Sequence, residues 1–203
     1  MRAVCILQRH LDRFTNRSLQ LAPFPMSTVI AELEELAYEV YHAIEELARQ
    51  RDRAVARIES YLRTTCRQRR FQFPHNWCDF ASCVLAGHIA RGLPDCRPIL
   101  LVKAQFKEGG GRHWWLRHSD IDVDITCGQF IGAPQLVVAR ESQWHRTVFD
   151  ENWEIEFCSR HLQVERFELY ITMLAARVDD LTSTSRTGRA VRLWADTTAE
   201  TGT

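Results

Sequence analysis

The chain has 203 residues, 45% of them hydrophobic, so it can bury a sizeable core and is not expected to be disordered as a whole. Its 26 basic and 26 acidic side chains cancel. This balance argues against a protein dedicated to nucleic-acid binding, which normally carries a basic excess. The length predicts one domain between terminal extensions.

Seven cysteines are spread along the chain, at positions 5, 66, 78, 83, 96, 127 and 158. An odd number at wide spacings does not indicate a disulfide framework and favours a reducing compartment. The N-terminal apolar run, at 3–7, is shorter than the about 7–15 residues of a secretion signal or the about 20 of a membrane span. We therefore expect a cytoplasmic protein that does not interact with membranes.

The N-terminal part predicts an arm followed by a long helical stretch. Residues 1–26 are rich in arginine and are expected to form a flexible arm. From Ser27 to about Tyr61, apolar residues recur at helical spacing and no Gly or Pro interrupts them. This stretch predicts either one long helix or two abutting helices.

A second, buried helix is predicted from Trp77 to Arg91. Asn76 precedes it and is a good N-cap, and Gly92 followed by Pro94 stops it. The apolar residues on several sides of this segment indicate that it lies inside the protein.

The second half of the chain predicts an antiparallel sheet followed by a helix, so the fold class is α+β. The domain is expected to span 27–180, with a mobile tail at 181–203. Its expected elements are a strand at 99–106, a hairpin of 113–117 and 121–126, a strand at 134–140, an ambiguous aromatic segment at 144–158 and a helix at 161–178.

Cys78 is the one cysteine that the sequence places in the first turn of a predicted helix. A catalytic cysteine reacts as the thiolate, and the positive end of a helix lowers the pKa of a thiol. Cys83, about one turn further along, is expected to be a small core residue. The sequence therefore predicts Cys78 as a nucleophile.

A histidine and two acids lie on the strands that follow. His113 comes directly after the glycine loop at 109–111, and Asp122 and Asp124 alternate with branched apolar residues on the next strand. Period-two alternation puts both acids on one face of that strand. A nucleophile, a base and an orienting acid are what acyl chemistry on an amide requires.

The register of the predicted hairpin decides which acid meets His113. A loop of about four residues places His113 opposite Asp124, and a loop of about two places it opposite Thr126, with Asp124 as the diagonal neighbour. A loop of about three residues would oppose it to Ile125 and destroy the arrangement. We therefore predict Asp124 as the partner, with Asp122 as the alternative.

These residues resemble the transglutaminase-like superfamily of papain-related cysteine enzymes. The similarity rests on Cys78 at the start of an apolar helix, His113 in an H-x-W pattern and Asp124 in a D-x-T pattern, and it covers about residues 72–130. Asn76 stands where that family usually has a glycine. The resemblance implies a papain/transglutaminase-like core, with the cysteine helix packed on an antiparallel sheet and the long N-terminal helix and a C-terminal helix added to it.

The resemblance implies a catalytic triad of Cys78, His113 and Asp124 acting on a peptide or protein substrate. Cys78 would attack the carbonyl of a peptide bond or of a glutamine carboxamide and form a thioester. Water would then complete hydrolysis or deamidation, as in a thiol protease or related hydrolase, and an amine would complete acyl transfer. We expect no cofactor and no metal. Candidate accessory residues are Gln72 for the oxyanion hole, and Trp77 and Trp115 for a substrate groove.

Two other hypotheses belong to different classes of protein. The domain could keep this fold as a catalytically inactive binding module, in which case Cys78 would react no faster than other thiols. It could also hold a structural zinc through Cys78, Cys83, His88 and Cys96. The two cysteines of the helix are separated by about 140° around its axis, which disfavours a shared metal.

Overall fold

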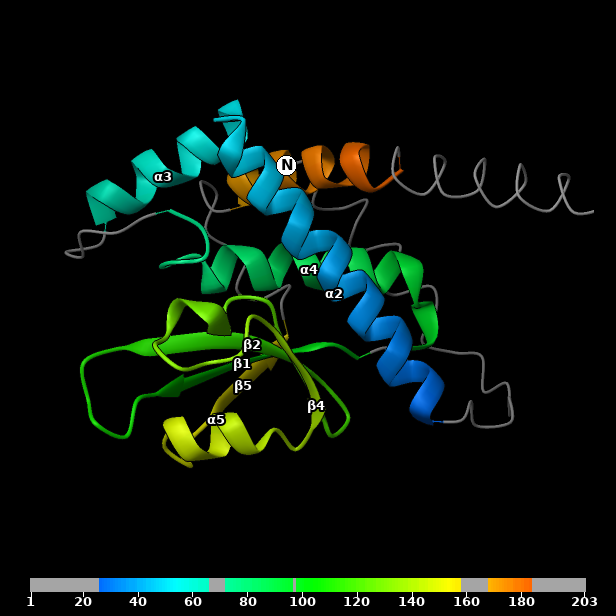
Figure 1. Cartoon of the computed structure of the whole chain (residues 1–203), viewed down its shortest axis with the longest axis vertical. Helices are drawn as coiled ribbons and strands as arrows, with labels where there is room; N and C mark the ends of the chain where they lie inside the picture. Colours follow the sequence, from blue (N-terminus) through cyan, green and yellow to red (C-terminus); the bar gives the residue numbers. More distant parts are fainter. Residues whose placement is uncertain (1–25, 66–71, 97, 158–167, 184–203) are drawn as a thin grey trace, which may run out of the picture.

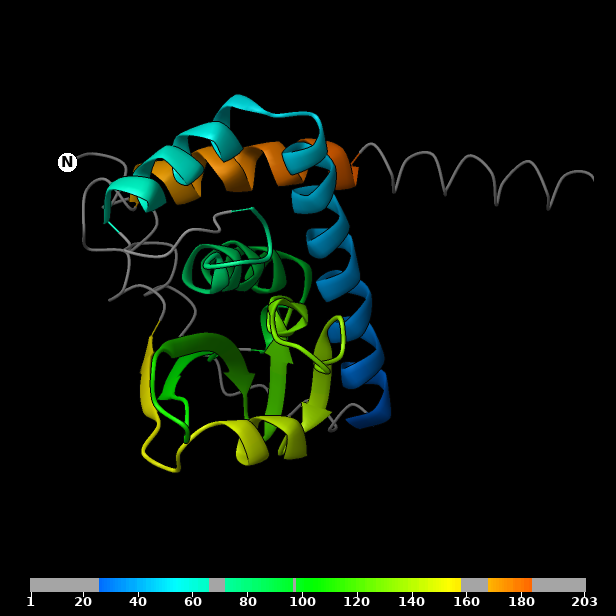
Figure 2. The ribbon, with the colours of Figure 1, turned by 60° about the vertical axis from the view of Figure 1, so that its left-hand side comes forward.

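The computed structural model describes residues 26–65, 72–96, 98–157 and 168–183. In these residues the helices and the sheet form successive layers, with α4 (Cys78–Gly92) between the sheet and an outer pair of helices (Figure 2). α2 (Met26–Arg49) runs alongside these layers and crosses α4 (Figure 1). Among the described residues, no helix is both long and apolar enough to span a membrane.

The long helical stretch of the sequence is divided into two abutting helices. α2 ends at Arg49, and α3 (Arg53–Thr65) begins after the short link at 50–52. Arg51 has a φ of 54°, which a helix cannot continue, and the Asp52 side chain accepts a hydrogen bond of 2.7 Å from the Ala54 N–H. Of the two predicted alternatives, one long helix or two abutting helices, the structure has two abutting helices.

α4 is the buried helix that the sequence predicts, one residue shorter at its start. Its cap position is Trp77 rather than Asn76, and Cys78 is the first helical residue. Asn76 instead adopts a φ of 63°, the left-handed conformation that only glycine, and less often Asn or Asp, adopts readily. The prediction of Asn76 as the N-cap is wrong because this backbone turns the chain one residue earlier.

In the part of the chain that the structure describes, five antiparallel strands form the sheet, in the order β4-β3-β2-β1-β5. The ambiguous segment at 144–158 contains a short helix and the last strand, and the predicted strand at 134–140 is shorter than expected. The bounds are β1 (Leu100–Gln105), β2 (Arg112–His118), β3 (Ile121–Asp124), β4 (Val137–Arg140), α5 (Gln143–Val148) and β5 (Glu154–Phe157).

The two faces of the sheet are buried against different partners. One face, which carries Leu116 and Val123, joins the main apolar core under α4 and α2. The opposite face carries Val102 and Trp115, which pack with Phe149 at the end of α5 in a smaller aromatic core. Figure 2 shows α4 and α5 on opposite sides of the sheet. Strand alternation thus separates an aliphatic face from an aromatic one.

The C-terminal helix covers 168–183, and the start of the predicted helix at 161–178 lies outside the described residues. Its Leu174 and Val178 are fully buried in the main core, and Arg177 binds Asp52 at 3.0 Å. The helix therefore continues past the predicted domain end at 180. The predicted arm lies outside the described residues except for Met26, which starts α2, and so does the predicted tail from 184 onward.

Asp122 is fully buried and ties the hairpin to α5. Its Oδ1 accepts hydrogen bonds from the Trp115 indole at 2.9 Å and the Arg117 Nε at 2.8 Å. Its Oδ2 accepts the Ser142 N–H at 2.9 Å, at the start of α5. Arg117 also lies 4.5 Å from the centre of the Trp153 ring. The carboxylate is paired and fully hydrogen-bonded, as a buried charge must be.

We expect Asp122→Asn to lower the free energy of unfolding by about 2–4 kcal/mol, because it leaves the Arg117 charge without its partner in a largely buried setting. Denaturant unfolding measures this loss. Asp120→Asn is the matched control, since Asp120 pairs with Arg140 at 3.6 Å on the surface and should change stability by less than about 1 kcal/mol. Equal effects of the two changes would show that the Asp122 network does not stabilise the fold.

Candidate functional site

The β2–β3 hairpin has the register that brings His113 close to Asp124. Arg117 pairs with Asp122, and His118 pairs with Ile121, so two residues form the turn. This is the second of the two permitted registers, in which Asp124 is diagonal to His113. The prediction that Asp124, and not Asp122, meets the histidine is confirmed by the contacts.

His113 and Asp124 form a buried hydrogen bond. The His113 Nε2 lies 2.7 Å from the Asp124 Oδ2, and both side chains are shielded from solvent. The imidazole ring stacks on Phe149 with ring centres 5.3 Å apart. Because an ionised carboxylate only accepts, the imidazole donates its Nε2–H, which leaves Nδ1 free to act as an acceptor.

Gln129 connects the Nδ1 of His113 to the loop before Cys78. Its Oε1 accepts the Asn76 N–H at 3.1 Å, and its Nε2 lies 3.4 Å from the His113 Nδ1. Gln129 is not predicted as a site residue by the sequence, because nothing in its spacing indicates that the short turn after β3 folds back toward the loop before Cys78.

Asp124 is held ionised by its surroundings. Burial alone would raise the pKa of its carboxyl, but the adjacent His113 and His145 side chains outweigh burial and hold the pKa below its usual range. The second oxygen, Oδ1, accepts the Thr126 N–H at 2.8 Å and the Thr126 hydroxyl at 3.0 Å. A buried carboxylate with this set of donors can remain charged.

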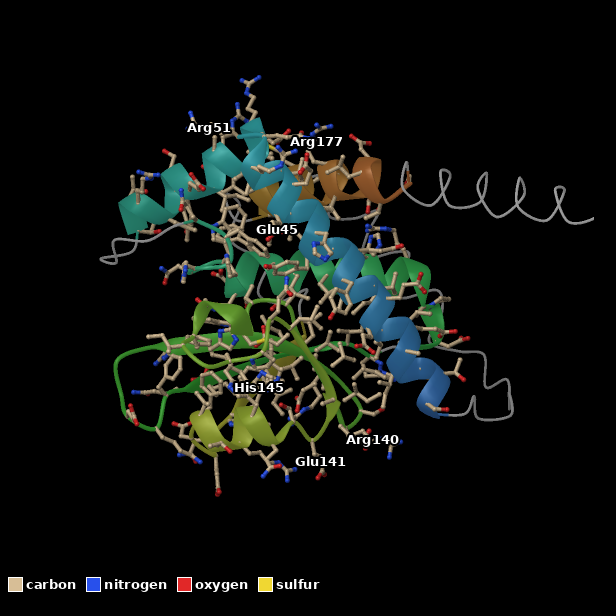
Figure 3. The ribbon with its side chains drawn as sticks, viewed as in Figure 1. Glu45, Arg51, Arg140, Glu141, His145 and Arg177 are labelled. Carbon is tan, nitrogen blue, oxygen red and sulfur yellow. The ribbon has the colours of Figure 1, made fainter. Side chains whose placement is uncertain are left out.

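His145, on α5, is a second histidine that contacts the Asp124 carboxylate. Its Nε2 lies 3.2 Å from the Asp124 Oδ2, and its ring stacks on Trp115 at 4.3 Å. Figure 3 shows His145 between α5 and the sheet, whereas Arg140 and Glu141 project outward. His145 is not predicted as a site residue by the sequence, because it lies in the segment at 144–158, whose pattern is ambiguous between helix and strand.

The two histidines and Asp124 are also a candidate metal site, since their ligand atoms lie within 4.8 Å of one another. Two ligands about 2.0–2.1 Å from a tetrahedral zinc would be about 3.3 Å apart. The His113 and Asp124 atoms are 2.7 Å apart, which is the distance of a charge-assisted hydrogen bond. The cluster therefore fits two N–H donors that share a carboxylate better than it fits a metal centre.

Cys78 lies at the end of α4, beside the start of β2. The backbone of Trp114, the residue after His113, and that of Asp79 hydrogen-bond to its sulfur. Burial raises the pKa of the Cys78 thiol well above its usual value, and the charges of Asp79 and Asp124 raise it further. The expectation of a lowered pKa is therefore wrong for this conformation, because loss of hydration outweighs the helix end.

Cys78 and His113 make no hydrogen bond with one another, although the backbone of Trp114, next to His113, contacts the Cys78 sulfur. Within the described residues, the partner of the His113 Nδ1 is the Gln129 amide, and the Cys78 sulfur makes no hydrogen bond to that nitrogen. The Asp124 charge contributes to the raised pKa of the Cys78 thiol, after burial and the Asp79 charge.

The three predicted accessory residues have other positions. Gln72 is exposed, and its carbonyl oxygen accepts the His75 N–H at 2.7 Å. Trp77 and Trp115 are both fully buried in the two cores, so neither lines a surface groove in this conformation. The aromatic rings complete the packing on either side of the sheet instead.

The four residues of the alternative zinc hypothesis do not converge. Among the described residues, the one metal-like cluster is that of His113, Asp124 and His145. His88 contacts Asp179 at 3.2 Å instead, across the interface between α4 and the C-terminal helix.

Comparison with known proteins gives no relative: no family model, no curated protein and no solved structure matches the chain.

We expect Asp124→Asn to lower the free energy of unfolding at pH 7 by about 2 kcal/mol, because it removes the charge that the histidines stabilise. The depressed pKa of Asp124 contributes stability above the unfolded value of about 3.9, and this contribution is lost as the pH falls through the folded value. The difference between wild type and variant should therefore narrow below about pH 4 in denaturant unfolding. A difference that stays constant there would contradict an ionised Asp124.

Proposed function

We propose that the protein is a cysteine-dependent enzyme that acts on amide carbonyls through a thioester, with Cys78 as nucleophile, His113 as general base and Asp124 as the residue that orients the base. The observation that carries this proposal is the buried His113–Asp124 hydrogen bond, whose opposite nitrogen is joined through Gln129 to the loop that leads into Cys78. The short sequence motifs around Cys78, His113 and Asp124, which resemble those of transglutaminase-like enzymes, support the same three residues.

The tautomer of His113 is the one that the reaction needs. With its proton on Nε2 and Asp124 as the acceptor, the imidazole presents the Nδ1 lone pair toward the side on which the Cys78 loop lies. Asp124 keeps this orientation and stabilises the positive charge that forms when Nδ1 takes a proton. Asp122, committed to Arg117 and Trp115, has no part in this step.

The first half-reaction transfers an acyl group to sulfur. The Cys78 proton moves to the His113 Nδ1, the sulfur lone pair bonds to the carbonyl carbon, and the carbonyl π electrons move to oxygen. When the tetrahedral intermediate collapses, the carbon–nitrogen bond breaks and the leaving nitrogen takes the proton from His113. Water or an amine, deprotonated by His113, then attacks the thioester and returns the thiol.

Burial of the Cys78 thiol indicates at which stage of the reaction its proton moves to His113. Because burial raises the pKa of Cys78, the resting cysteine is a thiol rather than a preformed thiolate. The proton is therefore transferred as the substrate binds. Such an enzyme protects its thiol from oxidation and from general alkylating agents, since both require the thiolate.

We expect p-nitrophenyl acetate, an activated acyl donor, to acetylate Cys78, with the modified residue mapped by mass spectrometry. Cys78→Ala should abolish this acetylation, and His113→Ala should slow it by about 10²-fold, the usual loss for a general base. Cys96→Ala and His118→Ala are the matched controls, because Cys96 is buried away from the cluster and His118 lies at the far end of β2. Ammonia release and amine incorporation on casein then separate deamidation from acyl transfer.

Two results would contradict the proposal. Acetylation of Cys78 that is equally fast in His113→Ala would show that this histidine is not the base. If Cys78 stays unmodified while another cysteine reacts, the domain is an inactive binding module. Dialysis against EDTA should leave acetylation unchanged, and a loss that added Zn²⁺ restores would favour a metal centre at the histidine cluster.

A further inference from the structure

Gln129 occupies the position between the nucleophile loop and the base. It ends the short turn η2 (Cys127–Gln129) that follows β3, and it is partly exposed, whereas His113 is fully buried. Its side-chain amide contacts both the Asn76 N–H and the His113 Nδ1. Among the described residues of the site, it is thus a polar group that a molecule from solvent could reach.

The hydrogen-bond polarity around Gln129 has only one consistent solution. The Asn76 backbone N–H can only donate, so the Gln129 oxygen faces it and the Gln129 NH₂ faces the His113 Nδ1. That nitrogen must then accept, which puts the histidine proton on Nε2, toward Asp124. One chain of donors and acceptors therefore runs from the nucleophile loop to the buried carboxylate.

This chain occupies the His113 Nδ1 with a donor. A protonated Nδ1 would point its N–H at the Gln129 NH₂, so two donors would face each other in a buried site. The same amide occupies the lone pair that has to receive the Cys78 proton. Other titratable groups act on this network from the elements around it, namely Asp124 on β3, Cys127 after β3, His145 on α5, and Cys78 and Asp79 at the start of α4.

We propose that Gln129 occupies the His113 Nδ1 and keeps it unavailable to Cys78 until a substrate carbonyl displaces the Gln129 amide, which then donates an N–H to the carbonyl oxygen as negative charge develops there. This inference rests on the proposed thioester chemistry. It assigns to Gln129 the oxyanion role that the sequence analysis gave to Gln72. It also requires a hydrogen-bond acceptor on the attacked group of the substrate, because the Gln129 N–H that leaves His113 has to find another acceptor.

The geometry favours this transfer. The attacked carbonyl must lie between the Cys78 sulfur and a donor, and Gln129 is anchored through Oε1 to the backbone two residues before Cys78. Rotation of the Gln129 side chain moves its NH₂ without breaking the short turn that carries it. The second hydrogen of the same NH₂ remains free to donate, so a carbonyl can begin to bind before the contact with His113 is lost.

The first experiment measures the rate of Cys78 alkylation by iodoacetamide against pH. In Gln129→Ala the His113 Nδ1 becomes free to accept the thiol proton, so we expect alkylation at about pH 7 to accelerate about tenfold and the midpoint to fall by about one unit. The matched control is Gln143→Ala, an exposed glutamine on α5 that should leave the profile unchanged. The double variant Gln129→Ala, His113→Ala should lose the gain.

The second experiment compares acylation with alkylation in the same variants. Acylation of Cys78 by p-nitrophenyl acetate passes through an oxyanion, whereas alkylation by iodoacetamide does not, so the ratio of the two rate constants reports oxyanion stabilisation independently of the amount of thiolate. Loss of one oxyanion donor costs about 10²–10³ in rate in other enzymes. We expect Gln129→Ala to lower this ratio by about tenfold or more, and Gln72→Ala to leave it unchanged.

The outcomes separate this inference from the function on which it rests. A gain in alkylation that persists in the double variant would show that Gln129 only packs over the thiol, and the inference would be overturned. The inference would also be overturned if Gln129→Ala left the pH profile of Cys78 alkylation unchanged, or left the ratio of the acylation and alkylation rate constants unchanged. In each case the acetylation test with His113→Ala still decides the proposed function, because that test does not involve Gln129.

Discussion

The buried carboxylate of Asp124 is the constraint on which the arrangement of the site depends. A charge inside a protein has to be matched by donors, because its loss of hydration is large. Here the donors come from β2, from α5 and from Thr126 in the chain that follows β3. These contacts bring His113 and His145 to the same oxygen, Oδ2 of Asp124, and so hold α5 against the sheet. They also determine which nitrogen of His113 faces the carboxylate.

The layered fold places α4 and the His113 side chain on different sides of the sheet. α4 packs on the aliphatic face, and α5 covers the aromatic face that carries His113. Cys78 is the first residue of α4, and the backbone of Trp114, near the start of β2, hydrogen-bonds to its sulfur. Burial against both layers makes the thiol a weak acid, so the helix end alone cannot activate it.

Two acids on the same face of one strand have different roles because their neighbours differ. Asp122 lies among Arg117, Trp115 and the start of α5, and it holds these elements together as a fixed ion pair. Asp124 lies two residues further along β3, and it contacts the imidazoles of His113 and His145 instead of a guanidinium. Arginine stays charged at any relevant pH, whereas histidine can exchange a proton, so only Asp124 has partners suited to acid–base chemistry.

The local pattern of the sequence determined most of the helices and strands, and within the site it determined the pairing of His113 with Asp124. Helical spacing predicts α2, α3 and α4, and period-two alternation together with the hairpin turn predicts that Asp124 meets His113. These features depend on residues close in the sequence, where spacing sets geometry. Only the tertiary structure decided the pKa of Cys78 and the contacts of His145 and Gln129, because burial and hydrogen bonds between distant segments leave no periodic signal in the chain.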